Sequence, residues 1–167
     1  GKILTMLGLV SLEKEGAVIA ASHHEQALVI GREIKDRYLE AMALSNLAYA
    51  MGVSQSDYST ALDYFEQAYS IACELGNAKG QGITLLNMGW LKGILGDYPA
   101  ADNYLRRALN VLRRIGERSQ EINAYVNLSA VAGRQGNAPD ALQWAEEALA
   151  LSVELGDRTG SAWAHFY

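Results

Sequence analysis

A short sequence pattern recurs along this chain about every 40 residues, and it limits the folds that the chain can adopt. Gly76, Gly116 and Gly156 each follow an apolar run and are separated by this period. Two alanine series keep the same spacing: Ala61, Ala101 and Ala141, then Ala68, Ala108 and Ala148. Such self-similarity is typical of proteins built from stacked structural repeats.

The repeat divides the chain into four units and the start of a fifth. The first unit is fainter, since Glu25-Gln26-Ala27 matches Glu66-Gln67-Ala68 only when the period is lengthened by one residue. The expected units, all within one domain over residues 1–167, span 1–35, 36–76, 77–116, 117–156 and, in part, 157–167. Because the sequence begins and ends inside helical patterns, we expect it to be a piece of a longer protein.

Each unit is predicted to form two antiparallel helices separated by turns. Asp57, Asp97 and Asn137 are good N-cap residues, because a short side-chain oxygen can accept from the free N–H groups of a first helical turn. The glycines at the ends of the units suit left-handed helix C-termini. The periodic alanines let the paired helices approach closely, so the sequence predicts an all-α fold, an α-solenoid.

Composition narrows the functional classes. The formal net charge of −5 disfavours nucleic acid and anionic membranes as partners, and no apolar run approaches a bilayer span of about 20 residues. Cys73 is the single cysteine, so no intrachain disulfide can form and a reducing, cytoplasmic location is expected. No metal-ligand cluster or nucleophile–base pattern stands out, which predicts a protein that is not an enzyme and needs no cofactor.

The repeat resembles the tetratricopeptide repeat. The residues that carry the resemblance are Gly89 in a first helix, the turn Gly96-Asp97-Tyr98, and Ala101, Leu105 and Ala108 in a second helix. The period exceeds the family's usual length of about 34 residues and is similar to the long variety of kinesin light chains, partner-of-inscuteable proteins and bacterial regulators. The resemblance implies a right-handed superhelix whose first helices line a concave groove that holds a protein or peptide ligand.

The groove residues are predicted from their register in the first helices. Two residue types recur there: asparagines, whose carboxamides can pair with a peptide backbone, and the aromatic pair Tyr49 and Trp90, which can anchor a ligand. The predicted groove comprises Asn46, Tyr49, Ile83, Leu86, Asn87, Trp90, Asn123, Val126, Asn127 and Arg134, with Trp163 and Phe166 expected from the fifth unit. The alternative is that the asparagines bond to neighbouring helices and that the aromatics pack between units.

Three further hypotheses remain open at this stage. The chain could be a regulatory segment of a multidomain bacterial signalling protein or transcription regulator, and it could self-associate through its terminal helices, where no polar cap is evident. An arginine cluster between Arg106 and Arg118 could bind phosphate, although a solvated outer face explains it as well.

Overall fold

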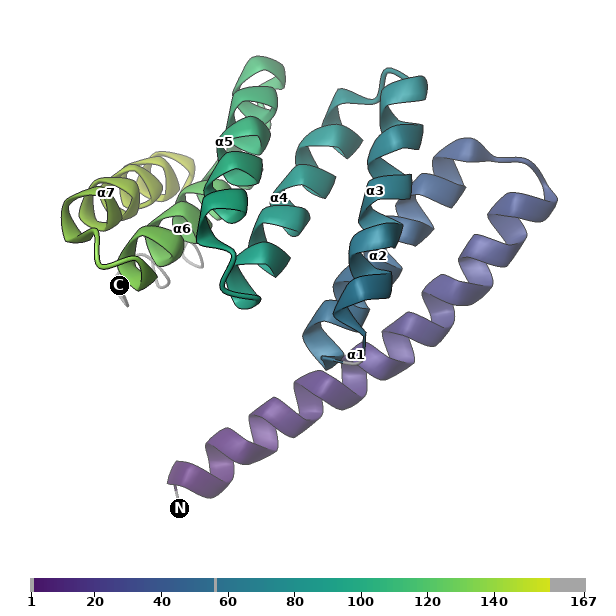
Figure 1. The fold of residues 1–167 in the computed structure, drawn as a ribbon, viewed down its shortest axis with the longest axis horizontal. Helices are drawn as coiled ribbons and strands as arrows, with labels where there is room; N and C mark the ends of the chain where they lie inside the picture. The colour runs from purple at the N-terminus through teal and green to yellow at the C-terminus, as the bar shows by residue number, and fades with distance from the viewer. Residues whose placement is uncertain (1, 56, 157–167) are drawn as a thin grey trace. The chain divides into compact units, whose positions relative to one another are not determined.

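The computed structural model describes residues 2–55 and 57–156, with side chains described from residue 16 onward. The described part holds seven helices and no strand. They are α1 (Lys2–Glu33), α2 (Arg37–Ser54), α3 (Tyr58–Glu74), α4 (Ala78–Ile94), α5 (Tyr98–Ile115), α6 (Arg118–Arg134) and α7 (Ala138–Leu155). The chain divides into two compact units, Gly1–Gly80 and Gln81–Tyr167, and consecutive helices pack together within each (Figure 1).

The predicted caps start the helices α3, α5 and α7. The side chains of Asp57, Asp97 and Asn137 each accept a hydrogen bond from the backbone N–H three residues further on. These bonds satisfy one of the free N–H groups of each first turn. The cap prediction is therefore confirmed, and α3, α5 and α7 begin at the same point of successive repeats.

The periodic glycines end the same helices. Gly116 and Gly156 are the C-cap residues of α5 and α7, with φ of 73° and 67°, a left-handed conformation that favours glycine. Helices of nearly equal length, 17 residues in α3 and 18 in α5 and α7, and of equal phase follow from these regular ends. The all-α repeat fold is thus confirmed, while the right-handed superhelix expected for the whole chain stays a prediction.

Close contact between paired helices is the main packing feature of the second unit. A Cβ atom built on Gly89 of α4 would lie 2.6 Å from Cγ of Leu105, a fully buried residue of α5. The equivalent residue of α6 is Ser129, whose hydroxyl donates to the Ala141 carbonyl of α7 at 2.8 Å. Gly89, which the sequence places in a first helix, and its equivalent Ser129 therefore lie where the paired helices meet.

The first repeat, expected over residues 1–35, differs from the predicted helix pair. Helix α1 runs unbroken over 32 residues and extends past α2, as Figure 1 shows. Gly16 occupies the register position of the cap residue Asp57, and its backbone stays helical. Without an acidic or asparagine cap, a left-handed glycine or a proline near this point, nothing ends the helix. Residues 2–33 therefore do not form two helices.

The second half of α1 packs against α2. Leu28 of α1 joins Leu44, Leu47 and Ile71 in the buried cluster of this unit. Glu40 of α2 accepts hydrogen bonds from Arg37 at 2.7 Å and from Arg32 of α1 at 3.1 Å. Within residues 2–55 and 57–156, no helical segment combines the length and the hydrophobicity that a bilayer span requires.

We expect Gly89→Ala to lower the free energy of unfolding by about 1–3 kcal/mol, because the new methyl group overpacks the contact with Leu105. Gly133→Ala in α6 is the matched control, since its Cβ would meet nothing closer than Ala141 at 4.0 Å. Alanine favours a helix over glycine by about 0.5–1 kcal/mol, so the control should be stabilised. Chemical denaturation of both variants measures the difference; equal shifts of the same sign would contradict the packing argument.

A second prediction concerns the pH dependence set by Glu40. Partial burial disfavours its charged form, but the hydrogen bonds from Arg32 and Arg37 outweigh this effect and lower the pKa of Glu40. A carboxylate whose pKa is lowered by folding stabilises the protein above its unfolded pKa of about 4.3 and loses that effect as the pH falls through the folded value. Glu40→Gln should therefore destabilise the protein at neutral pH.

The test compares the unfolding free energy of wild type and Glu40→Gln between neutral pH and about pH 3. The difference between the two proteins should shrink toward the acid end. Glu66→Gln, at an exposed position of α3, is the control and should stay within about 0.5 kcal/mol of wild type. A pH-independent difference for Glu40→Gln would refute the linkage.

Candidate functional site

One face of α4 carries a row of incompletely buried side chains. Ile83, Asn87, Trp90 and Ile94 follow one another at steps of four, three and four residues, which places them on one side of a helix. All four are half-buried or exposed, while their neighbours Leu85, Met88 and Leu91 are buried in the core. The row is therefore the solvent-facing side of a helix whose other side is packed in the core.

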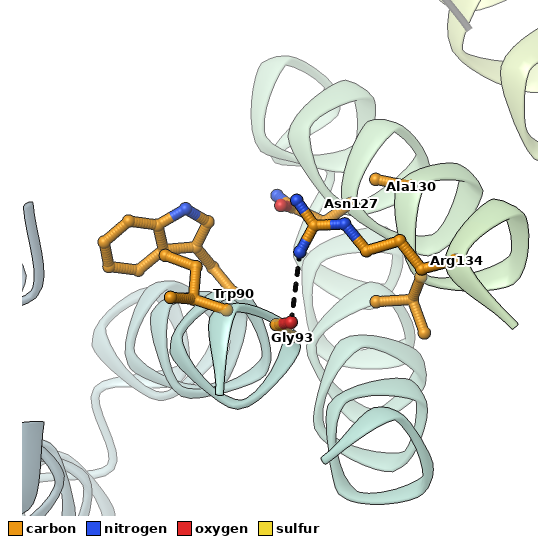
Figure 2. A pocket seen from close by; sticks show the side chains of 7 residues that line it. Trp90, Gly93, Asn127, Ala130 and Arg134 are labelled. Carbon is orange, nitrogen blue, oxygen red and sulfur yellow. Dashed lines mark hydrogen bonds between the residues drawn. The ribbon is translucent and has the colours of Figure 1, made fainter. Parts of the chain in front are cut away.

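Helix α6 carries the same row one repeat later. Its members are Asn123, Asn127, Ala130 and Arg134, again half-buried or exposed. A small open pocket of about 120 Å³ lies between the two rows (Figure 2). It is lined by Trp90, Gly93, Ile94, Asn127, Ala130, Val131 and Arg134. We call the two rows together the α4/α6 face.

Arg134 links the two helices of this face. Its Nη1 donates to the carbonyl oxygen of Gly93 at 3.1 Å, in the last turn of α4. The carbonyl end of a helix favours a cation, so the contact is electrostatically favourable. Figure 2 shows the Arg134 side chain extending from α6 toward Trp90, with its guanidinium beside Asn127. Arg134 is also the single charged member of the two rows, in a chain of net charge −5.

The asparagine amides of α6 bond within that helix. Nδ2 of Asn127 donates to the carbonyl oxygen of Asn123 at 2.8 Å, and Nδ2 of Asn123 donates to Oε1 of Gln120 at 3.2 Å. Both partners belong to α6, whereas the sequence suggested either a ligand or a neighbouring helix. These bonds hold the Asn127 side chain in place at the wall of the pocket.

The compact unit Gly1–Gly80 carries the equivalent row on α2. Asn46 is exposed, and Tyr49 and Met42 keep 46% and 47% of their surface accessible. In the second unit, Trp90 is half-buried at the position that matches Tyr49. The aromatic residues singled out from the sequence are thus at least partly open to solvent.

The structure corrects one predicted groove residue and adds others. Leu86 is only 5% exposed and belongs to the core, because it lies on the packed flank of α4 next to Asn87. Val126, the matching residue of α6, is half-buried. Sequence reasoning missed Ile94, although continuing the row by one turn beyond Trp90 would have found it. Trp163 and Phe166 lie outside the described residues.

The arginine cluster makes contacts within the chain. Nε of Arg106 lies 2.7 Å from Oδ2 of Asp102, and the Arg106 guanidinium stands over the Trp144 ring at 5.2 Å. Arg113 donates to the Tyr125 hydroxyl, and Arg118 pairs with Glu154 at 2.6 Å. These contacts favour the structural interpretation of the cluster over a phosphate site.

Comparison with known proteins finds a match to one repeat of the chain. Residues 122–155, which span nearly all of α6 and α7, match the family model described as tetratricopeptide repeat. No relative was found among curated proteins. This match and the helical repeat support the recognition of a tetratricopeptide repeat from the sequence. Repeats of this family generally serve as protein-interaction modules, whereas membership in the long variety stays a prediction.

Proposed function

We propose that the chain is a scaffold that binds an extended segment of a partner protein on the α4/α6 face. The single observation that carries this proposal is the pair of rows in identical register, half-open to solvent and separated by a pocket. The remaining surface of α4 and α6 is largely committed to the core. We further propose that the role is one of binding without catalysis.

The chemistry of the face suits a peptide in extended conformation. Carboxamides of Asn87 and Asn127 can each donate to and accept from a peptide backbone. Packed helices lie about 8–10 Å apart and an extended chain advances about 3.3 Å per residue, so the two amides could reach backbone groups about three residues apart. This recognition would not depend on the peptide's side chains.

Side-chain preference would come from the residues around the pocket. Trp90 and Ile94 offer an apolar wall for one aliphatic or aromatic side chain of the partner. Arg134 offers guanidinium N–H groups to a carboxylate or a backbone carbonyl of the same segment. The pocket of about 120 Å³ is small for an organic ligand, whose sites usually measure about 300–1,000 Å³, and suits a single side chain.

The test starts with peptides selected from a random display library against the full chain. Trp90→Ala combined with Asn127→Ala should weaken the selected peptides at least about 30-fold, because buried tryptophan anchors are worth about 2 kcal/mol or more at interfaces. Fluorescence anisotropy measures the affinity. Asn110→Ala, at an exposed position of α5, is the control and should leave the affinity unchanged.

Backbone NMR of the labelled chain identifies the surface directly. Selected peptides should shift the amide signals of Asn87, Trp90, Asn127 and Arg134 more than those of the outer helices α5 and α7. Circular dichroism confirms that the double variant keeps its helical content. Peptide-induced shifts confined to the outer helices, or undiminished affinity of the folded double variant, would reject this face as the binding site.

A further inference from the structure

Helix α1 exposes a stripe of large apolar side chains. Val18, Ile19, Val29 and Ile30 keep 60%, 61%, 55% and 51% of their surface accessible. The two Val–Ile pairs are separated by about three helical turns, so they lie on one side of the helix. The side that packs on α2, marked by the buried Leu28, faces the opposite way. We call these four residues the α1 stripe.

The repeat itself does not account for the α1 stripe. Helices α3, α5 and α7 match the second half of α1 in the register of the repeat. At the positions equivalent to Val18 and Val29, these outer helices are exposed and carry polar residues, small residues or proline. These residues are Ser59 and Ser70 in α3, Pro99 and Asn110 in α5, and Pro139 and Ala150 in α7. The valines of α1 therefore stand where the other helices of this kind carry solvent-type residues.

Ile30 is a second residue of the α1 stripe whose exposure departs from that of its equivalent in the repeat. Its equivalent in α3 is Ile71, which is only 4% exposed within the core of the first unit. A side chain of this kind is normally buried, whereas Ile30 stays about half open. The stripe thus combines one core-type position without its cover and two solvent-type positions made apolar.

We propose that the α1 stripe binds the α1 stripe of a second copy of this chain in an antiparallel helix pair. The apolar residues are arranged symmetrically about His24: one Val–Ile pair lies six and five residues before it, and the other lies five and six residues after it. Turning a second helix end over end about this point brings Val18 against Ile30 and Ile19 against Val29. Such self-complementarity is what a two-fold interface requires.

The centre of the stripe supports the same arrangement. Ser22 and Gln26 lie between the apolar pairs on the same side of α1, and both are exposed. In the antiparallel pair, Ser22 of one copy meets Gln26 of the other, and a hydroxyl and a carboxamide can hydrogen bond. A polar pair at the centre of an apolar helix interface fixes its register.

The second copy fits the stripe better than an unrelated partner. A different protein would require an apolar surface but no symmetry about a single residue. The stripe spans about 18 Å along the helix, at about 1.5 Å per residue, so a second helix lying antiparallel along it contacts both Val–Ile pairs. An interface of this length is smaller than the usual protein interface of about 1,600 Å², so the dimer should be weak, on the order of micromolar.

Sedimentation equilibrium of the full chain between about 5 and 500 µM tests the dimer, because this range brackets a weak association. Wild type should dimerise, and Val18→Glu combined with Val29→Glu should raise the dissociation constant at least tenfold. The matched control is Leu142→Glu combined with Val153→Glu, which has the same sequence spacing on α7 and exposures of 62% and 67%. This control should dimerise like wild type.

Three outcomes would overturn the proposal: a wild-type chain that stays monomeric, a stripe variant that still dimerises, or loss of the dimer in the α7 control alone. The last outcome would place self-association at the other end of the described helices. Glutamate suits positions 18 and 29, because the equivalent residues of α3, α5 and α7 are exposed to solvent. The stripe variant should therefore keep its helical content, which circular dichroism measures.

Cysteine cross-linking tests the antiparallel register without changing the stripe. In a Cys73→Ser background, Ser22→Cys and Gln26→Cys are made separately and then mixed under mild oxidation. Because a disulfide needs Cβ atoms about 3.5–4.5 Å apart, the mixed 22–26 disulfide should form at least severalfold faster than either homodimer. Fastest cross-linking of Ser22→Cys with itself would indicate a parallel pair, and equal rates would indicate random collision; both would contradict the proposal.

Discussion

The close approach of paired helices is the contact on which the second unit depends. Gly89 lies against Leu105 with no room for a methyl group, and the Ser129 hydroxyl bonds to a carbonyl of α7. Small residues at these points let the leucines of the facing helix enter the space between them. Each helix then buries one side almost completely, and this burial removes apolar surface from water, which is the dominant favourable term in folding.

A helix that buries one side against its partner leaves the opposite side available. On α4 and α6 this side carries two rows with the same spacing, because both helices begin at the same phase of the repeat. The pocket beside Trp90 is therefore a consequence of the packing register. Arg134 lines this pocket and donates to the Gly93 carbonyl, so a single cation joins the two helices beside it.

Helix α1 shows the effect of a missing turn in the first repeat. Gly16 stands where a cap would start a new helix, and α1 continues as one element. Its apolar stripe is left on the side away from α2, where the other outer helices show serine, proline, asparagine or alanine. Surface helices normally place polar residues there, and this departure underlies our proposal that α1 pairs with a second copy of the chain.

The sequence by itself determined the helices that begin and end with a cap, because a cap such as Asp57 or a left-handed glycine such as Gly116 acts on backbone groups within a few residues. It also determined the register that places Asn127 and Trp90 on one side of their helices. Only the tertiary structure decided that Leu86 is buried and that Arg134 reaches Gly93, a residue of the preceding repeat. Those outcomes depend on the angle and distance between packed helices, and no local pattern encodes them.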